Sequence, residues 1–300
     1  MKIAKKKLSR MSERKLFYIF VSPWLIGLVL FTLGPMVFSM VLAFTSWNMI
    51  QPIEWVGISN FRTIFTDDRD FWLSLRATFI WASFLPVGII LALFLANFLN
   101  KKIRAIPVFR TIIYIPTIVP AVVNSFLWLW IFNPEFGMAN MMLGWFGIPG
   151  LRWLLSPNTA MISLIIMSLW QVGGNTIIFL AALQNVPKDI IEASDIDGAS
   201  SIVKYFRITL PMISPMIFFQ FIMGIIGALQ VFTPAFLMTG GGPGPTRPTF
   251  FYILYLYQVA FVRFDMGYAS ALAWILFGIT LILTLLVFKF LGRKIYYEAD

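Results

Sequence analysis

The side chains that could do chemistry in this 300-residue chain lie in one polar insert and in a few uncharged amides within apolar stretches. The insert reads Glu-Ala-Ser-Asp-Ile-Asp-Gly at residues 192–198, and Ile-Thr-Leu-Pro follows at 208–211. Because the chain has no histidine and no cysteine, it offers no imidazole base, no thiolate nucleophile and no thiolate metal site. Few enzyme mechanisms fit that inventory, so docking and hydrogen bonding are the chemistry that these residues favour.

The stretches around the insert are too apolar for a soluble domain. Hydrophobic residues make up 59% of the chain and charged residues 12%, whereas roughly a quarter of the residues of a soluble protein are charged. Six charge-free windows can each hold the ~20 apolar residues that cross a bilayer. We therefore predict an all-α, polytopic membrane protein with six transmembrane helices, near residues 17–44, 76–99, 108–131, 160–184, 212–237 and 267–290.

The distribution of basic residues predicts the orientation, because cytoplasmic segments of membrane proteins collect Lys and Arg. With the N-terminus inside, most of the 23 Lys and Arg residues fall on the cytoplasmic side. We predict that both termini are cytoplasmic, with residues 1–15 as a basic tail and residues 16–300 as the membrane domain. The net charge of +10 follows from this bias, so we expect the lipid bilayer of a cell membrane as a partner and no nucleic acid.

The polar insert belongs to a loop, residues 186–211, between the fourth and fifth predicted spans. Pro187 suits the first position of a helix, Asp189 complements the positive end of that helix, and Gly198 can close it in a left-handed conformation. A second short helix near 200–209 would lead into the fifth span. These features fit a helix that docks onto another protein, and they fit equally an amphipathic connector packed against its own bundle.

The loop resembles the EAA loop of the permease subunits of ATP-binding-cassette (ABC) importers, in which Glu-Ala-Ala and a glycine precede Ile-x-Leu-Pro. Ser194 replaces the second alanine of that pattern and is nearly as small. Further stretches resemble the carbohydrate branch of these permeases, which includes the maltose, lactose and glycerol-3-phosphate importers. These stretches are 55–61, 110–120, Gly137 with Asn140, 239–243, 260–261 and 267–271.

The resemblance implies the type I ABC importer permease fold and an assembly with several partners. These partners are a second homologous permease subunit, two copies of an ABC ATPase and an extracytoplasmic solute-binding protein. The chain has no nucleotide-binding motif, so we expect it to bind no cofactor and place ATP and Mg²⁺ on the partner ATPase. The resemblance assigns coupling to the ATPase to Asp189, Glu192, Ala193, Ser194, Asp195, Gly198, Ala199, Leu210 and Pro211.

A carbohydrate substrate needs hydrogen bonds from amides or hydroxyls together with an aromatic face. Gln230 is our first choice as a substrate contact, because its position resembles the amide-rich part of the maltose permease's sugar site. The other candidates could instead join helices or pack between them, which is common for amides and indoles in spans. The full set of expected substrate contacts is Gln230, Phe232, Gln171, Asn175, Trp170 and Asn124.

The sequence thus predicts a transport subunit without its own ATPase site, which moves a sugar or oligosaccharide into the cytoplasm. One alternative is an ABC permease for a non-sugar solute such as an amino acid or polyamine. Another is an ion-coupled secondary transporter, but such proteins usually carry intramembrane acids and the six predicted spans contain no Asp or Glu. A membrane enzyme would need a metal triad, a Ser–His pair or a carboxylate dyad, and the spans contain none.

Overall fold

A computed structural model describes residues 13–101, 103–242 and 247–292 of the chain. Three parts of the sequence-based predictions lie outside these residues: most of the basic tail, the stretch 243–246 and the C-terminal end. The chain divides into two compact units, and each is described by itself. The first comprises residues 1–66 and 259–274, and the second comprises residues 67–258 and 275–300.

The first unit begins with an apolar helix that runs over 28 residues, Lys15–Leu42. It comprises all but the first two residues of α2 (Glu13–Leu28), the π-helical segment η1 (Val29–Leu33) and α3 (Gly34–Leu42). The π segment precedes Pro35, which has no N–H to donate, and Gly34 donates instead to the carbonyl of Val29 five residues back. The helix confirms the first predicted span.

Two short strands and a helix follow this first helix within the first unit. Strands β1 (Thr45–Ser46) and β2 (Glu54–Trp55) pair antiparallel, and α4 (Ser59–Thr66) comes directly after them. The amide of Asn60 donates to two backbone carbonyls next to the end of α3, at 3.0 and 2.9 Å. Part of the sugar-branch resemblance, residues 55–61, therefore has a structural role, since it fixes how the chain leaves the first helix.

The long helices of the described residues confirm four of the predicted spans, the first, second, fifth and sixth. Besides the first helix, three stretches are long and apolar enough to cross a membrane. The second span combines α5 (Arg69–Ala82) with α6 (Leu85–Leu99), and the fifth combines α15 (Ser214–Leu229) with α16 (Thr233–Thr239). The sixth is the single helix α18 (Met266–Leu291).

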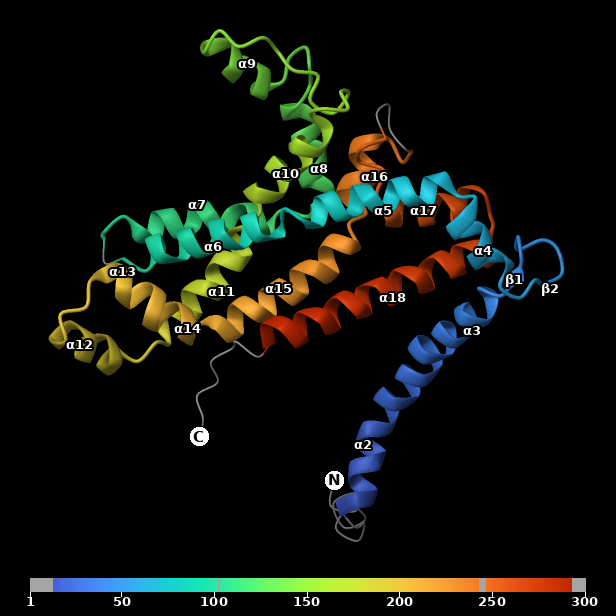
Figure 1. Cartoon of the computed structure of the whole chain (residues 1–300), viewed down its shortest axis with the longest axis horizontal. Coiled ribbons are helices and arrows are strands. Elements are labelled where there is room, and N and C mark those ends of the chain that lie inside the picture. Colours follow the sequence, from blue (N-terminus) through green and yellow to red (C-terminus); the bar gives the residue numbers. More distant parts are fainter. Residues whose placement is uncertain (1–12, 102, 243–246, 293–300) are drawn as a thin grey trace, which may run out of the picture. The chain divides into compact units, whose positions relative to one another are not determined.

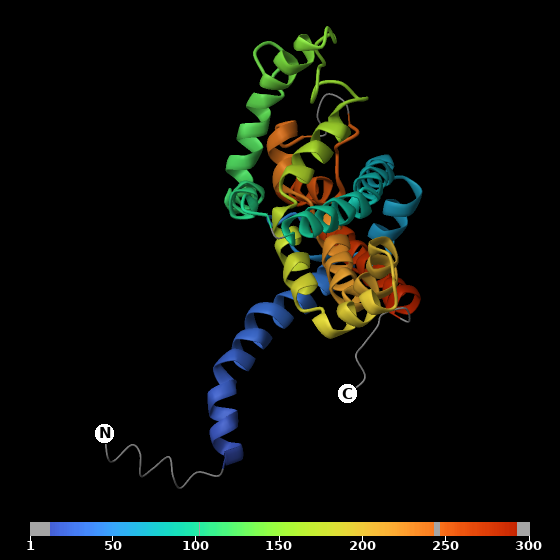
Figure 2. The same cartoon turned by 90° about the vertical axis from the view of Figure 1, so that its left-hand side faces the viewer.

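The third and fourth predicted spans are each formed by two helices that meet at a bend. Helix α7 (Ile106–Ile118) meets α8 (Ala121–Ile131) at 102°, and α10 (Ala160–Trp170) meets α11 (Gly173–Gln184) at 44°. Figure 2 shows α8 turning away from α7. The sharp bend has a cause in Pro120, which disfavours helical geometry in the residue before it and donates no hydrogen bond. The count of six spans holds only if each bent pair is one span.

The core of the second unit lies where α11 packs against α6 and α7, and α15 packs against both α6 and α11 (Figure 1). Ala92 and Ala96 of α6 are fully buried and small, so Phe179 of α11 can pack closely against that helix. At the start of α11, Gly173 leaves no room for a side chain, because a Cβ there would lie 2.0 Å from the carbonyl oxygen of Ile113. This tight packing holds the break between α10 and α11 in place.

The segment between α8 and α10 contains the short helix α9 (Met138–Trp145). Asn140 organises this segment. Its Oδ1 accepts from the backbone N–H of Leu151 at 2.9 Å and from Nε1 of Trp153 at 2.8 Å, and its Nδ2 donates to two carbonyls. Between α16 and α18 lie α17 (Tyr252–Tyr257) and η3 (Gln258–Val262).

Candidate functional site

The polar insert forms helix α12 (Lys188–Ile196) with a well-defined beginning and end. Pro187 occupies the N-cap, one residue earlier than predicted, and Asp189 lies in the first turn. The helix ends in a Schellman motif around Gly198, whose φ is +73°. In that motif the N–H of Ala199 donates to the backbone carbonyl of Ser194 at 3.0 Å, and the N–H of Gly198 donates to the backbone carbonyl of Asp195 at 3.1 Å. The predicted left-handed cap is confirmed.

The second half of the loop folds back on α12. Helix α13 (Ser201–Lys204) leads into a π-helical turn, η2 (Tyr205–Thr209), and then α14 (Leu210–Met212), so the predicted second helix is confirmed with an altered last turn. The altered turn has a cause in Pro211, which cannot donate to the carbonyl four residues back. An ion pair between Lys204 Nζ and Asp195 Oδ1 joins the two halves of the loop.

The loop exposes acidic, small and apolar side chains. Glu192 and Ala193 are exposed. Ile196 and Ile202 are 88% and 72% exposed, and Phe206 is exposed as well. A connector packed on its own bundle would bury such apolar side chains, whereas a docking helix presents them to a partner. Of the two interpretations that the sequence left open, the exposure favours docking.

The residues predicted to couple to the ATPase are not all on that exposed surface. Ser194 is only 7% exposed, and its hydroxyl donates to the carbonyl of Ile191 at 2.6 Å, so its small size serves packing inside the loop. Ala199, Leu210 and Pro211 are half-buried. The exposed members of the predicted coupling set are Asp189, Glu192, Ala193, Asp195 and Gly198.

A polar cleft of about 560 Å³ lies between the loop and the ends of α6 and α11. Glu192, Lys188 and Lys204 line it together with Asn97 of α6. The amide of Asn97 donates to the hydroxyl of Tyr205 at 2.9 Å, which ties the loop directly to a membrane-spanning helix. This pair was not predicted from the sequence. The only signal was an asparagine inside an apolar stretch, and its partner is 108 residues away.

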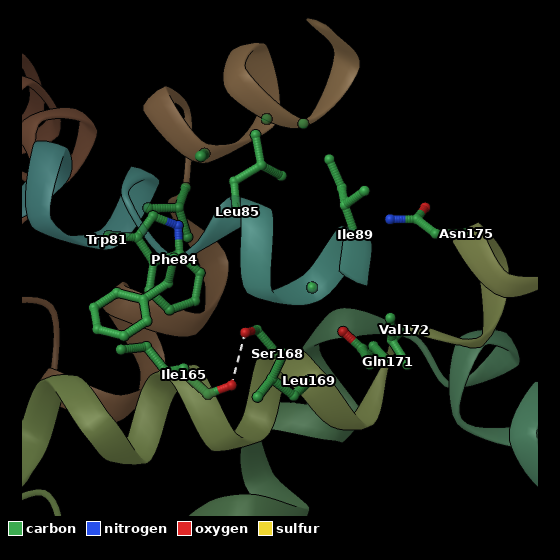
Figure 3. Close-up of a pocket in the computed structure, with 15 residues that line it drawn as sticks. Trp81, Phe84, Leu85, Ile89, Ile165, Ser168, Leu169, Gln171, Val172 and Asn175 are labelled. Atoms are coloured by element: carbon green, nitrogen blue, oxygen red, sulfur yellow. Dashed lines mark hydrogen bonds between the residues drawn. The ribbon is translucent and has the colours of Figure 1, made fainter. Parts of the chain in front are cut away.

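A second cavity, of about 240 Å³, lies among α5, α6, α10, α11 and α15 (Figure 3). Trp81 and Phe84 lie toward one side of it, and the amides of Gln171 and Asn175 lie toward the other. The break between α10 and α11 brings these two amides to the cavity, since Gln171 caps α10 and Asn175 is in the first turn of α11. Two of the predicted substrate contacts are thus close together, beside two aromatic side chains that the prediction had missed.

The polar groups of this cavity are uncharged, and only some are occupied by other protein groups. Oδ1 of Asn175 accepts from Nε2 of Gln220 at 3.0 Å, and the hydroxyl of Ser168 donates to the carbonyl of Ile165 at 2.8 Å. The side chain of Gln171 has no hydrogen-bond partner within the described part of the chain. A free amide opposite two aromatic rings can bind an uncharged, hydroxyl-rich molecule.

The other predicted substrate contacts do not line this cavity. Gln230 caps α15 and is exposed, while its neighbour Val231 is at the cavity wall. Phe232 packs in an aromatic cluster, with ring centroids 5.3 Å from Phe236 and 5.2 Å from Tyr257. Gln230 and Phe232 lie at the break between α15 and α16. They flank the cavity residue Val231 in the sequence, but they do not line the cavity.

Asn124 and Trp128, one turn apart on α8, form a separate buried pair. Asn124 is 1% exposed, and neither polar atom of its side chain has a hydrogen-bond partner among the described residues. Nε1 of Trp128 is also unpaired, and its ring packs edge-on against Trp170 at 5.8 Å. Buried amides are usually hydrogen-bonded, so an unpaired one is costly. Asn124 therefore has free hydrogen-bonding capacity, but outside the cavity that holds Gln171.

Residues 84–295 match the model of a protein family described as the binding-protein-dependent transport system inner membrane component. The chain belongs to this family. As an inner membrane component with several apolar helices, it is a multi-pass protein of the cytoplasmic membrane and a permease subunit of an ABC importer. The resemblance inferred from the polar loop is confirmed, whereas the side on which the termini lie stays a prediction.

Several permeases are similar to this chain over nearly its whole length. The probable ABC transporter permease protein YesP of Bacillus subtilis is 39% identical over 94% of this chain and 92% of its own. The sn-glycerol-3-phosphate permease UgpA of Pectobacterium atrosepticum is 32% identical over 94% and 95%. The sulfoquinovosyl glycerol permease SmoG of Agrobacterium fabrum is 30% identical over 95% and 92%.

Solved structures establish the fold of the chain. A chain from a bacterial ABC transporter that imports the acidic polysaccharide alginate superposes with a TM-score of 0.84 at 24% identity. The match covers 97% of this chain and 98% of the other.

Proposed function

We propose that this permease moves a carbohydrate into the cytoplasm and is driven by ATP hydrolysis on a separate ATPase subunit. The observation that carries the proposal is the exposed loop α12–α13, which offers an acidic and apolar docking surface with a rigid glycine cap. Exposed side chains of this kind need a partner. Because the chain has no nucleotide-binding motif, it needs a partner that supplies the energy for transport.

In the proposed assembly the chain pairs with a second homologous permease, two copies of an ABC ATPase and an extracytoplasmic solute-binding protein. The ATPases hold ATP and Mg²⁺. Glu192 would face basic groups of an ATPase, and Ile196 would fill an apolar recess in it. Motion of the ATPase would then pass through Tyr205 to Asn97, because their hydrogen bond joins the loop to α6.

The proposed substrate is an uncharged carbohydrate, bound in the cavity of Figure 3. The cavity residues include aromatic and amide side chains but no charged side chain, which favours stacking and neutral hydrogen bonds over the recognition of an acid. Its 240 Å³ is below the roughly 300–1,000 Å³ of typical ligand pockets, so it would hold a single sugar unit at a time. Gln171 and Asn175 are the proposed contacts, with Trp81 as the stacking face.

The test is ATP-driven sugar uptake by the complete complex in proteoliposomes. Gln171→Leu should lower uptake while basal ATP hydrolysis is kept, because Gln171 has no protein partner to lose. Thr176→Val is the matched control, since Thr176 is a buried polar residue of α11 that does not line the cavity and whose hydroxyl donates to the carbonyl of Val172. Equal uptake by both variants across sugar concentrations would refute the assignment of the cavity.

A further inference from the structure

A third pocket, of about 390 Å³, has a different character and shares no residue with the substrate cavity. It lies between α5, the beginning of α10 and the segment before α17. Two guanidinium groups, those of Arg76 and Arg247, are on its wall. Every other lining residue is apolar, among them Leu73, Ile80 and Met161. The pocket is therefore amphipathic, with cations on an otherwise apolar wall.

The position of Arg76 along α5 places this pocket at the boundary of the hydrocarbon layer. The next 24 residues, 77–100, carry no charge. One turn before Arg76, Trp72 is 51% exposed, and exposed tryptophans of spanning helices mark the membrane interface. An arginine followed by an apolar wall at this depth faces phospholipid headgroups and the first part of their acyl chains.

The charges at the pocket do not cancel. Arg247 forms an exposed ion pair with Asp70 at 3.3 Å, whereas Arg76 forms none with any described residue. Arg247 also has a φ of +52°, a left-handed conformation that is rare for residues other than glycine. Such strain is found where the surrounding structure holds a side chain in a specific position. The local charge therefore favours an anion.

We propose that this pocket binds a glycerophospholipid, with its phosphate between Arg76 and Arg247 and an acyl chain along Leu73, Ile80 and Met161. Guanidinium groups bind phosphate oxygens through paired, charge-assisted hydrogen bonds. A free phosphate would gain nothing from the apolar wall. A hydrophilic acidic segment of another protein would leave the wall uncovered. Only a lipid uses both parts of the pocket.

The experiment measures retention of phosphatidylglycerol by the purified complex, using native mass spectrometry over a range of lipid concentrations. Arg76→Gln should weaken retention of one lipid by roughly ten- to a hundredfold, the loss expected for hydrogen bonds to a charged group. Arg69→Gln removes the same charge from an exposed position of the same helix that does not line the pocket, so it should leave retention unchanged. Arg76→Lys keeps the charge and should retain part of the affinity.

Three outcomes would overturn the proposal. The first is equal lipid retention by Arg76→Gln and Arg69→Gln. The second is displacement of the lipid by inorganic phosphate at matched concentrations, which would identify a simple anion site. The third is unchanged lipid retention together with weaker binding of the solute-binding protein, which would identify a protein docking site. Equal thermal stability of the variants is checked first, so that misfolding is not mistaken for loss of the site. None of these outcomes depends on which solute the permease carries.

Discussion

The substitution Gly173→Ala tests the tight packing that holds the broken fourth span. A Cβ at Gly173 would lie 2.0 Å from the carbonyl oxygen of Ile113 and 2.9 Å from its carbonyl carbon. Both atoms belong to the backbone of α7, so no side-chain rotation can relieve the clash and the two helices must separate. Overpacking of this kind typically costs about 1–3 kcal/mol.

The helix propensity of alanine offsets part of this cost. Replacing glycine by alanine inside a helix gains at most about 1 kcal/mol, and Gly173 is at the first position of α11, where the gain is smaller. We therefore expect Gly173→Ala to lower the free energy of unfolding by about 1–2 kcal/mol. Because the separation occurs beside Gln171 and Asn175, sugar uptake should fall as well.

The neighbouring residue provides the control for this experiment. A Cβ at Gly174 would meet only Cγ2 of Thr117, at 3.9 Å, which is an ordinary contact. Gly174→Ala should therefore be neutral or stabilise the protein by up to about 1 kcal/mol. The assay is the midpoint of thermal unfolding of the purified complex in detergent. Equal midpoints for the two variants would refute the close approach of α7 and α11.

Three further substitutions have outcomes that follow from the structure. Gly198→Asp should keep the spans inserted but reduce co-purification of the ATPase more than Gly198→Asn does. Both variants share the backbone strain of about 1–2 kcal/mol at φ +73°, and only Asp adds a charge. Full recovery of active ATPase with Gly198→Asp would contradict the docking assignment. Asn124→Leu removes two unpaired buried atoms and should stabilise the complex by about 1–3 kcal/mol, so a lower unfolding midpoint would show that Asn124 has a partner in the assembly. Gln230→Ala should reduce uptake less than Gln171→Leu, since Gln230 does not line the cavity, and the reverse order in transport assays would restore Gln230 as the main contact.

The spans and the loop 186–211 could be predicted from the sequence because their signals are local. An apolar run long enough to cross a bilayer is visible in any window, and the acidic first turn of α12 and its glycine cap follow from residues a few positions apart. The break at Pro120 was also visible as a residue type, but its bend of 102° depends on how α8 packs against other helices.

The cavity could be predicted only in part, because its walls come from five helices. Gln171 and Asn175 stood out as amides in an apolar stretch, and both line it. Trp81 did not stand out, since a tryptophan near the end of a span usually marks the interface. Gln230 looked equally suitable by residue type, and only the break after α15 turns it away from the cavity. The bond between Asn97 and Tyr205 is a tertiary contact with no local signal.

ATP-driven uptake in proteoliposomes tests the central claim most directly. The chain is reconstituted with its partner permease and ATPase, ATP is enclosed, and the solute-binding protein with labelled sugar is added outside. We predict uptake that requires both ATP and the ATPase, and none from the chain alone under a proton or sodium gradient. Gradient-driven sugar uptake by the chain without an ATPase would contradict the account.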